Sequence, residues 1–336
     1  MRILYWGTPI YAVPTLKALH QAGHQIVGVV TQPDRRRRRG NKLQASPVKA
    51  CAESLGLKVF TPERIKTDLE CQGELAKLNC DISIVVAFGQ ILPKVMLNQF
   101  PLGCWNGHGS LLPRWRGAGP IQWALMEGDT ETGVGIMDME EELDTGPILI
   151  EQRIPIGIRQ NAFQLAEQLS QLTAQLMVKA IPLIEAAGPG PKEERLARLA
   201  VKPQTQTMSY ARMLRKKDFE INWGNPALTI HRQVMGLYPG VLTYWRGKRL
   251  KILDTEPLTN QLKNQLSDEA RSLLGRWRVD EHAPSTVLEC ISNLGIVVSG
   301  NGCPLLIREA QLEGKARSYG QSLIQSLTAT PGDLLS

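Results

Sequence analysis

The sequence contains no apolar run near the roughly 18 residues that a membrane-spanning helix needs. Its first ten residues lack the charged and apolar stretches of a secretory signal peptide. Only six cysteines occur among 336 residues, and no two stand at the C-x-x-C spacing of zinc or redox motifs. We therefore expect a cytoplasmic protein with six reduced thiols and no membrane partner.

A dinucleotide fingerprint is also absent. The first strand-to-helix turn reads Gly7-Thr8-Pro9, without the second and third glycines of that motif, and Pro9 has no amide to offer a phosphate. The five histidines and six cysteines do not assemble into a recognisable set of zinc ligands. We expect neither a nicotinamide or flavin nucleotide at this turn nor a bound metal.

Strands alternate with helices over the first half of the chain, which predicts an α/β domain with a doubly wound, Rossmann-like parallel sheet. Apolar runs indicate strands at 2–7, 25–32, 57–60, 81–89, 102–108, 132–139 and 146–156. Helices are expected near 10–22, 47–55, 119–127 and 161–187.

The composition changes near residue 188. Residues 188–194, GPGPKEE, are a charged, turn-rich connector, and short strand-like runs separated by Gly, Asn and Pro follow from about residue 205. This spacing predicts a smaller antiparallel β-barrel that is OB-like. We therefore divide the chain into an α/β domain (1–189), a linker (190–207) and a barrel domain (208–330).

Positive charge is distributed unevenly. The net charge is +7; residues 1–189 carry 19 Lys and Arg against 18 Asp and Glu, and the remaining residues carry 20 against 14. The near-neutral first part nevertheless contains five consecutive arginines at 35–39, which repel one another and predict a loop. A basic loop and a basic second domain favour a polyanionic partner, the alternative being a solvated surface.

One strand end carries residues suited to acyl chemistry. Asn106 and His108 are two apart at the end of a strand, so both side chains face the same way. An amide can donate to a developing oxyanion, and an imidazole can transfer a proton near neutral pH. A histidine that only fixes the strand end is the alternative. The run Glu140–Glu142 and Asp144 offer a carboxylate to orient the imidazole, and spacing does not choose among the four.

These residues lie within longer motifs that resemble the signature of folate-dependent formyltransferases. NGHGSLLPRWRGAGP, at 106–120, is similar to the family pattern Asn-x-His, Ser-Leu-Leu-Pro, Arg-Gly and Pro, and Leu143–Gly146 to Leu-Asp-x-Gly. GTP after the first strand, TQPDR before the arginines, and AFGQILP at 87–93 extend the resemblance. SYARMLRKKDFEINW at 209–223 and YPG at 238–240 carry it into the second domain.

The resemblance implies transfer of the formyl group of 10-formyltetrahydrofolate to the α-amine of methionine on initiator tRNA, by a monomer without a metal. It implies Asn106, His108 and Asp144 as the catalytic set, which would settle the choice of carboxylate. Residues implied to line the folate site are Phe88, Gly89, Gln90, Ile91, Leu92, Ser110, Leu111, Leu112 and Pro113. Residues implied to enter the tRNA acceptor stem are Arg35, Arg36, Arg37, Arg38, Arg39 and Lys42.

Two departures from the family pattern leave alternatives open. Position 107 is Gly where relatives carry a β-branched residue, and the basic loop is a pure arginine run where relatives mix Pro, Gly, Arg and Lys. A transferase acting on a small amine, such as an amino-sugar nucleotide or glycinamide ribonucleotide, would need neither the arginines nor the basic second domain. An RNA-binding protein without catalysis is a further alternative. Whether Arg114 and Arg116 face folate, tRNA or the protein stays open.

Overall fold

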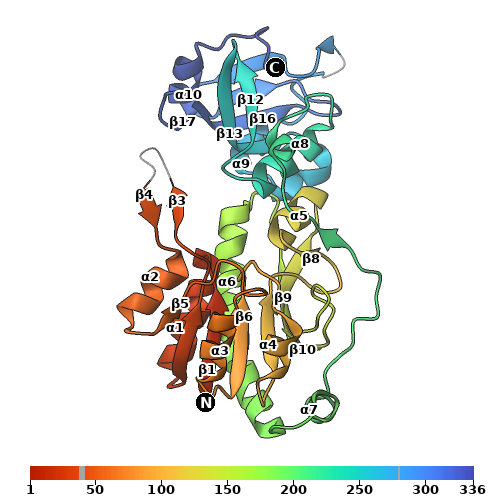
Figure 1. Cartoon of the computed structure of the whole chain (residues 1–336). Helices are drawn as coiled ribbons and strands as arrows, with labels where there is room; N and C mark the ends of the chain where they lie inside the picture. Colours follow the sequence, from red (N-terminus) through yellow and green to blue (C-terminus); the bar gives the residue numbers. More distant parts are fainter. Residues whose placement is uncertain (38–41, 279–280) are drawn as a thin grey trace. The chain divides into compact units, whose positions relative to one another are not determined.

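The computed structural model describes residues 1–37, 42–278 and 281–336 (Figure 1). The chain forms two compact units. The first unit comprises residues 1–120, 131–154 and 166–212, and the second comprises 121–130, 155–165 and 213–336. Residues 190–207, which the sequence suggests as a linker, lie within the first unit. No helix in the described part of the chain is both long and apolar enough to span a membrane.

A seven-stranded sheet in the order β10-β9-β7-β6-β1-β2-β5 forms the first unit. Its strands are β1 (Arg2–Gly7), β2 (Gln25–Val30), β5 (Val59–Phe60), β6 (Ile82–Val86), β7 (Cys104–His108), β9 (Glu131–Asp138) and β10 (Ile148–Pro155). The predicted Rossmann-like parallel sheet is confirmed from β5 to β7. Strand β9 departs from it and runs antiparallel to β7. A parallel neighbour needs a crossover helix, whereas α5 (Pro120–Glu127), between these strands, belongs almost wholly to the second unit.

Helices cover both faces of this sheet (Figure 1). They are α1 (Val13–Gln21), α2 (Pro47–Ser54), α3 (Leu69–Ala76), α4 (Lys94–Asn98) and α6 (Ala162–Ala187), with α7 (Lys192–Leu199) following. Because side chains alternate along a strand, Leu4 and Trp6 of β1 pack with Leu75 of α3 and Met96 of α4. Tyr5, between them, donates its hydroxyl to the carbonyl of Ala12 on the opposite face.

Local signals set the helix ends that the sequence anticipates. The Ser46 hydroxyl accepts a 3.0 Å hydrogen bond from the Lys49 amide, and Pro47 occupies the first position of α2. This arrangement satisfies one amide that the first helical turn leaves without a partner and starts α2 at the residue that the sequence predicts.

The second unit is built on an antiparallel sheet, as predicted. Its strands are β12 (Leu242–Trp245), β13 (Lys248–Pro257), β14 (Val287–Ile291), β15 (Gly295–Val298), β16 (Leu305–Leu312) and β17 (Ser318–Tyr319), paired in the path β12-β13-β16-β15-β14 with β17 against β16. Leu334 bridges Thr286 beside β14, and Leu335 bridges Trp245 at the end of β12. The last residues of the chain therefore join the two edges of the sheet, in agreement with a small barrel. Helices α8 (Ala227–Gly236), α9 (Asp268–Ser272) and α10 (Gly320–Leu327) accompany it.

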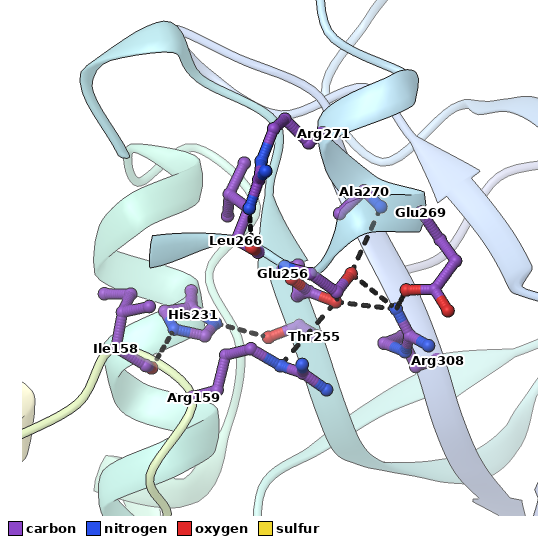
Figure 2. A network of polar contacts seen from close by, with 11 residues as sticks. Ile158, Arg159, His231, Thr255, Glu256, Leu266, Glu269, Ala270, Arg271 and Arg308 are labelled. Atoms are coloured by element: carbon purple, nitrogen blue, oxygen red, sulfur yellow. Dashed lines mark hydrogen bonds and ion pairs between the residues drawn. The ribbon is translucent and has the colours of Figure 1, made fainter. Parts of the chain in front are cut away.

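A fully buried histidine links α8 to its surroundings (Figure 2). Nε2 of His231 lies 2.8 Å from the carbonyl oxygen of Ile158, and Nδ1 lies 2.9 Å from Oγ1 of Thr255 on β13. A carbonyl can only accept, so Nε2 carries the proton and Nδ1 accepts from the hydroxyl. Burial lowers the pKa of His231 to about 4.

Next along β13, the fully buried Glu256 is surrounded by donors (Figure 2). Arg308 donates to its Oε1 at 2.7 Å, and Nε of Arg159 lies 3.7 Å from the same oxygen. The Ser267 amide and hydroxyl each donate to the carboxylate at 2.8 Å. A buried carboxylate is tolerated when charged and hydrogen-bonded partners surround it, so this network fixes residues 155–165 within the second unit.

Candidate active site

Strand β7 places the two side chains that the sequence singles out. Asn106 and His108 are 9% and 6% exposed and lie on one face of β7. Asn106 is opposite Val85 of β6, so both side chains stand at the carboxyl end of a parallel strand pair. In open α/β sheets this edge is where ligands bind. Trp105, which precedes Asn106 in β7, is fully buried and donates its indole N–H to the Leu102 carbonyl.

The turn between β9 and β10 brings Asp144 to this edge. Its Oδ1 lies 3.5 Å from Nδ2 of Asn106, and its Oδ2 lies 3.6 Å from Nδ1 of His108. The Asp144 side chain is 10% exposed. Of the other candidate carboxylates, Glu141 pairs with Lys94 and Glu140 with Lys192. The structure therefore assembles Asn106, His108 and Asp144 as one cluster.

Backbone groups fix the orientation of this cluster. Nε2 of His108 lies 3.0 Å from the carbonyl oxygen of Trp115, which can only accept, so Nε2 is the donor and Nδ1 faces the carboxylate. The amide of Gly117 donates to Oδ2 of Asp144 at 2.8 Å. Imidazole and carboxylate are thus held by the same short segment, residues 115–117.

The turn that carries Asp144 is closely packed. Asp144 itself has a φ of +54°, a conformation that is uncommon for residues other than glycine and that the surroundings must enforce. A Cβ on Gly146 would lie 1.8 Å from the Asp138 carbonyl oxygen, so no larger residue fits there. The Asp-x-Gly spacing therefore has a steric cause that the sequence alone does not reveal.

Residues 202–211 line this site and belong to the first unit, whereas the sequence suggests a linker up to residue 207 and the barrel domain from residue 208. Strand β11 (Tyr210–Ala211) pairs in parallel with β8 (Arg116–Gly117), and the Ser209 hydroxyl accepts from the Trp115 amide at 3.0 Å. The Gln204 side chain bonds to both the Asp144 turn and Arg116. In this segment only the motif that starts at residue 209 resembles the family, and Gln204 lies before that motif.

The two arginines of the motif have different environments. Arg116 is 8% exposed, and its Nε and Nη2 donate to Oε1 of Gln204 at 3.0 and 2.6 Å. Arg114 is exposed, and its guanidinium lies 4.4 Å from the centroid of the Trp115 ring. Arg116 thus faces the protein, whereas Arg114 lies at the surface.

The residues implied for folate lie in the loops after β6 and β7. Five of them are buried: Phe88, Leu92, Ser110, Leu112 and Pro113. Leu111 and Gln90 are half-buried, and Gly89 and Ile91 are exposed. Gln90 accepts from the Ile65 amide at 2.9 Å, and the Ser110 hydroxyl donates to the Arg114 carbonyl at 2.7 Å. These side chains are used to hold the loops in place. A ligand at this edge of the sheet would therefore contact mainly the loop backbone and the Ile91 side chain.

A pocket of about 230 Å³ opens beside these loops, among residues that follow β1, β2 and β6. Phe88 and Gly89 line it together with Thr8, Gln32 and Arg35. Nε2 of Gln32 donates to the carbonyls of Phe88 and Gly89 at 3.2 and 3.0 Å, and the Arg35 guanidinium donates to its Oε1. The base of the arginine block therefore adjoins the predicted folate loop.

The arginine block differs from the irregular loop that its charge predicts. Strands β3 (Arg35–Arg37) and β4 (Lys42–Gln44) pair antiparallel, so the chain forms a hairpin. Pairing satisfies backbone groups that a loop would leave to water. Arg38 and Arg39 lie outside the described residues.

Gly107 has a structural explanation. A Cβ at this position would lie 2.5 Å from Cγ2 of Thr173 on α6, so the helix occupies the space that a side chain would need. Thr173 is fully buried, donates to the Leu169 carbonyl, and contacts the Tyr11 hydroxyl at 2.8 Å.

Thiolate chemistry is disfavoured. All six cysteines are free, and burial raises the pKa of each, to about 12 for Cys104 at the start of β7. Within residues 1–37, 42–278 and 281–336, no three His, Cys, Asp or Glu side chains are grouped to hold a metal ion. The side chains that converge at this site are an amide, an imidazole and a carboxylate.

Comparison with known proteins identifies relatives over the whole chain. Residues 1–181 match the model of the formyl transferase family, and residues 213–328 match that of the formyl transferase C-terminal domain. The chain is 69% identical to the methionyl-tRNA formyltransferase of Synechococcus sp. strain CC9902, over 99% of this chain and 98% of that protein. It is 66% identical to that of strain WH7803, over 100% and 98%.

Solved structures share the fold at lower identity. An N-formyltransferase from Helicobacter canadensis, solved with folinic acid and dTDP-3-aminofucose, has a TM-score of 0.61 at 18% identity, covering 91% of this chain and 98% of that one. A sugar 3N-formyl transferase has a TM-score of 0.60 at 19% identity, covering 94% and 99%. The chain therefore belongs to the formyl transferase family, among the methionyl-tRNA formyltransferases.

Proposed function

We propose that this protein transfers the formyl group of 10-formyltetrahydrofolate to the α-amine of methionine on initiator tRNA, giving N-formylmethionyl-tRNA for translation initiation. One observation carries the proposal: Asn106, His108 and Asp144 converge at the ligand-binding edge of the sheet, with separations of 3.5 and 3.6 Å. The 69% identity to a methionyl-tRNA formyltransferase supports it.

Each member of the cluster has a chemical role in this proposal. The neutral amine attacks the formyl carbon and forms a C–N bond, which makes the formyl oxygen an oxyanion. The Asn106 amide donates to that oxygen, and the protonated His108 stabilises it through its positive charge, because Nε2 of His108 donates to the Trp115 carbonyl. Asp144 orients His108 through Nδ1 and stabilises its positive charge. The C–N10 bond then breaks, the folate nitrogen takes up a proton, and the amine nitrogen loses one, so atoms and charge balance.

The folate is assigned to the loops after β6 and β7. The segment 88–92 and residues 110–113 follow neighbouring parallel strands, one of which carries Asn106 and His108. The exposed Ile91 offers an apolar contact to a flat pterin ring. A donor bound there would present its formyl group to the cluster without a metal.

The tRNA is assigned to the arginine hairpin and to the basic C-terminal part of the chain, residues 190–336. Arg35 lines the pocket beside Phe88, which supports binding of a polyanion next to the donor site. Residues 190–336 carry an excess of six positive charges, 20 against 14, which suits a tRNA backbone. We place the protein in the cytoplasm as a monomer, where six free thiols are stable.

The deciding experiment incubates the full chain with 10-formyltetrahydrofolate and methionyl-tRNA, and measures acid-stable formylmethionine. Initiator tRNA is compared with elongator methionyl-tRNA and with free small amines, including an amino-sugar nucleotide and glycinamide ribonucleotide. We expect turnover on the initiator species. No formylmethionine at saturating, active donor contradicts the proposal, and equal activity on a small amine favours a small-molecule acceptor.

A further inference from the structure

We propose that Gln204 is a positioning residue for this site: its side-chain amide holds the Asp144 turn and Arg116 in one arrangement. The inference rests on the proposed function, because it concerns the geometry needed for formyl transfer. Gln204 lies outside every motif that points to this family, in a segment that composition marks as a linker. Nothing in the sequence distinguishes it from Gln206.

The contacts of Gln204 use its donor and its acceptor. Nε2 donates to the carbonyl oxygen of Asp144 at 2.9 Å and to that of Gly146 at 2.8 Å. Oε1 accepts from Nε and Nη2 of the buried Arg116 at 3.0 and 2.6 Å. A side-chain amide offers two hydrogens on nitrogen and two lone pairs on oxygen, so these four contacts occupy it fully.

The two carbonyls belong to the turn that sets the carboxylate. Asp144 is held at a φ of +54°, which needs support from its surroundings. On one side of the turn, Gly146 rests on the Asp138 backbone with no room for a Cβ. Gln204 bonds to the residues on either side of Thr145. Without it, the turn would keep its steric contact and lose both hydrogen bonds to the side chain.

Arg116 connects Gln204 to the imidazole. Arg116 stands between Trp115, whose carbonyl accepts from His108, and Gly117, whose amide donates to Asp144. Gln204 therefore ties together the segment that orients the imidazole and the turn that presents the carboxylate. The neighbouring backbone is anchored separately, by the Ile148–Lys202 bridge and by β11 against β8. Loss of the Gln204 side-chain amide alone should thus leave residues 202–211 in place and loosen the Asp144 and Arg116 side chains.

The test measures single-turnover formylation by Gln204→Ala and by the isosteric Gln204→Glu. Gln204→Glu keeps an acceptor for Arg116 but sets an oxygen against two carbonyls, so it isolates the donor half of the contact. A displacement of the reacting groups by about 1 Å can cost on the order of 100-fold in rate. We expect both variants to lose 10-fold to about 100-fold in the rate of the chemical step, with KM for donor and tRNA within about threefold of wild type.

Gln206→Ala is the matched control, because Gln206 is exposed and two residues away in the same segment. It should retain the wild-type rate. A double-mutant cycle with Asp144→Ala separates positioning from folding. If Gln204 acts through Asp144, then Gln204→Ala should change the residual rate of Asp144→Ala by less than about twofold.

Three results would overturn the inference. A wild-type rate for Gln204→Ala removes any role. Losses that multiply in the double variant would mean that Gln204 acts independently of the Asp144 carboxylate. An increase in KM with an unchanged chemical step would make it a binding residue. Failure of the proposed function is distinguishable, since wild type itself would then show no transfer to methionyl-tRNA.

Discussion

The carbonyl oxygen of Trp115 lies 3.0 Å from Nε2 of His108 and thereby determines which ring nitrogen faces Asp144. The backbone leaves Nδ1 opposite the carboxylate, 3.6 Å away. That distance is longer than a normal hydrogen bond between a ring nitrogen and a carboxylate oxygen. Apo structures commonly show loose catalytic contacts that tighten when substrate binds.

The first prediction concerns this pair. His108→Ala and Asp144→Asn should each lower turnover by about 100-fold or more, because each removes part of the group that stabilises the formyl oxyanion. Affinity for tRNA should stay within a few-fold, since neither side chain belongs to the arginine hairpin. Quench-flow formylation and filter binding measure the two quantities.

Glu142→Gln is the matched control for Asp144→Asn. Glu142 is exposed and lies two residues before Asp144 in the same acidic run. It should retain wild-type turnover. Comparable losses at both positions would mean that the acidic run acts through its summed charge and not through Asp144.

The sequence predicts those features that depend on neighbouring residues. Period-2 alternation places Asn106 and His108 on one face of β7, and Ser46 with Pro47 marks the start of α2. Each depends on contacts within a few residues, which local spacing encodes.

Features that depend on distant partners could not be predicted. Gln204 reaches Asp144 across 60 residues of chain, and the bridges of Leu334 and Leu335 join strands more than 40 residues away. The antiparallel direction of β9 follows from the placement of α5, which no local pattern specifies. For the same reason charge repulsion indicates that the arginines avoid a helix but does not reveal the hairpin.

The second prediction concerns the contact between β7 and α6. Gly107→Ala should destabilise the protein by about 1–3 kcal/mol, because the new methyl group would overpack against Cγ2 of Thr173. Thr173→Ser removes that methyl and keeps the hydroxyl that bonds to Leu169 and Tyr11. The double variant should therefore recover most of the loss. Urea denaturation of the four proteins measures this, and additive losses would contradict it.

The third prediction concerns the arginine block. Changing residues 35–39 to Ala should weaken tRNA binding and reduce the slope of log K against log salt by up to about 0.7–0.9 for each phosphate that the protein no longer neutralises. Filter binding at several salt concentrations gives both quantities. An unchanged slope would mean that the block does not contact the tRNA.

A charge-matched variant controls for the removal of five positive charges. It replaces five exposed basic residues elsewhere in the first unit with Ala: Lys17, Arg64, Lys66, Lys77 and Lys179. Its tRNA affinity should exceed that of the arginine variant at every salt concentration. Equal weakening by both would indicate a response to net charge rather than to the hairpin.

The last prediction concerns pH and the buried His231, whose pKa burial lowers from 6.5 to about 4. Between these values the unfolded chain binds a proton at this histidine and the folded chain does not. The free energy of unfolding should therefore fall as the pH drops from about 6.5 to about 4, by about 3 kcal/mol for this group. His231→Gln should remove that part of the pH dependence, although it costs stability at neutral pH through the contacts with Ile158 and Thr255.

Chemical denaturation of the full chain at pH 7, 5.5 and 4.5 measures the slope of the free energy of unfolding against pH. The exposed His282 provides the control. His282→Gln should leave the slope of wild type unchanged, because His282 is exposed and takes no part in the contacts of His231. If His231→Gln does not alter the slope, then His231 is protonated in the folded protein near its ordinary pKa. The Ile158 carbonyl and the Thr255 hydroxyl would then have to rearrange around an imidazolium, since Nδ1 would become a donor.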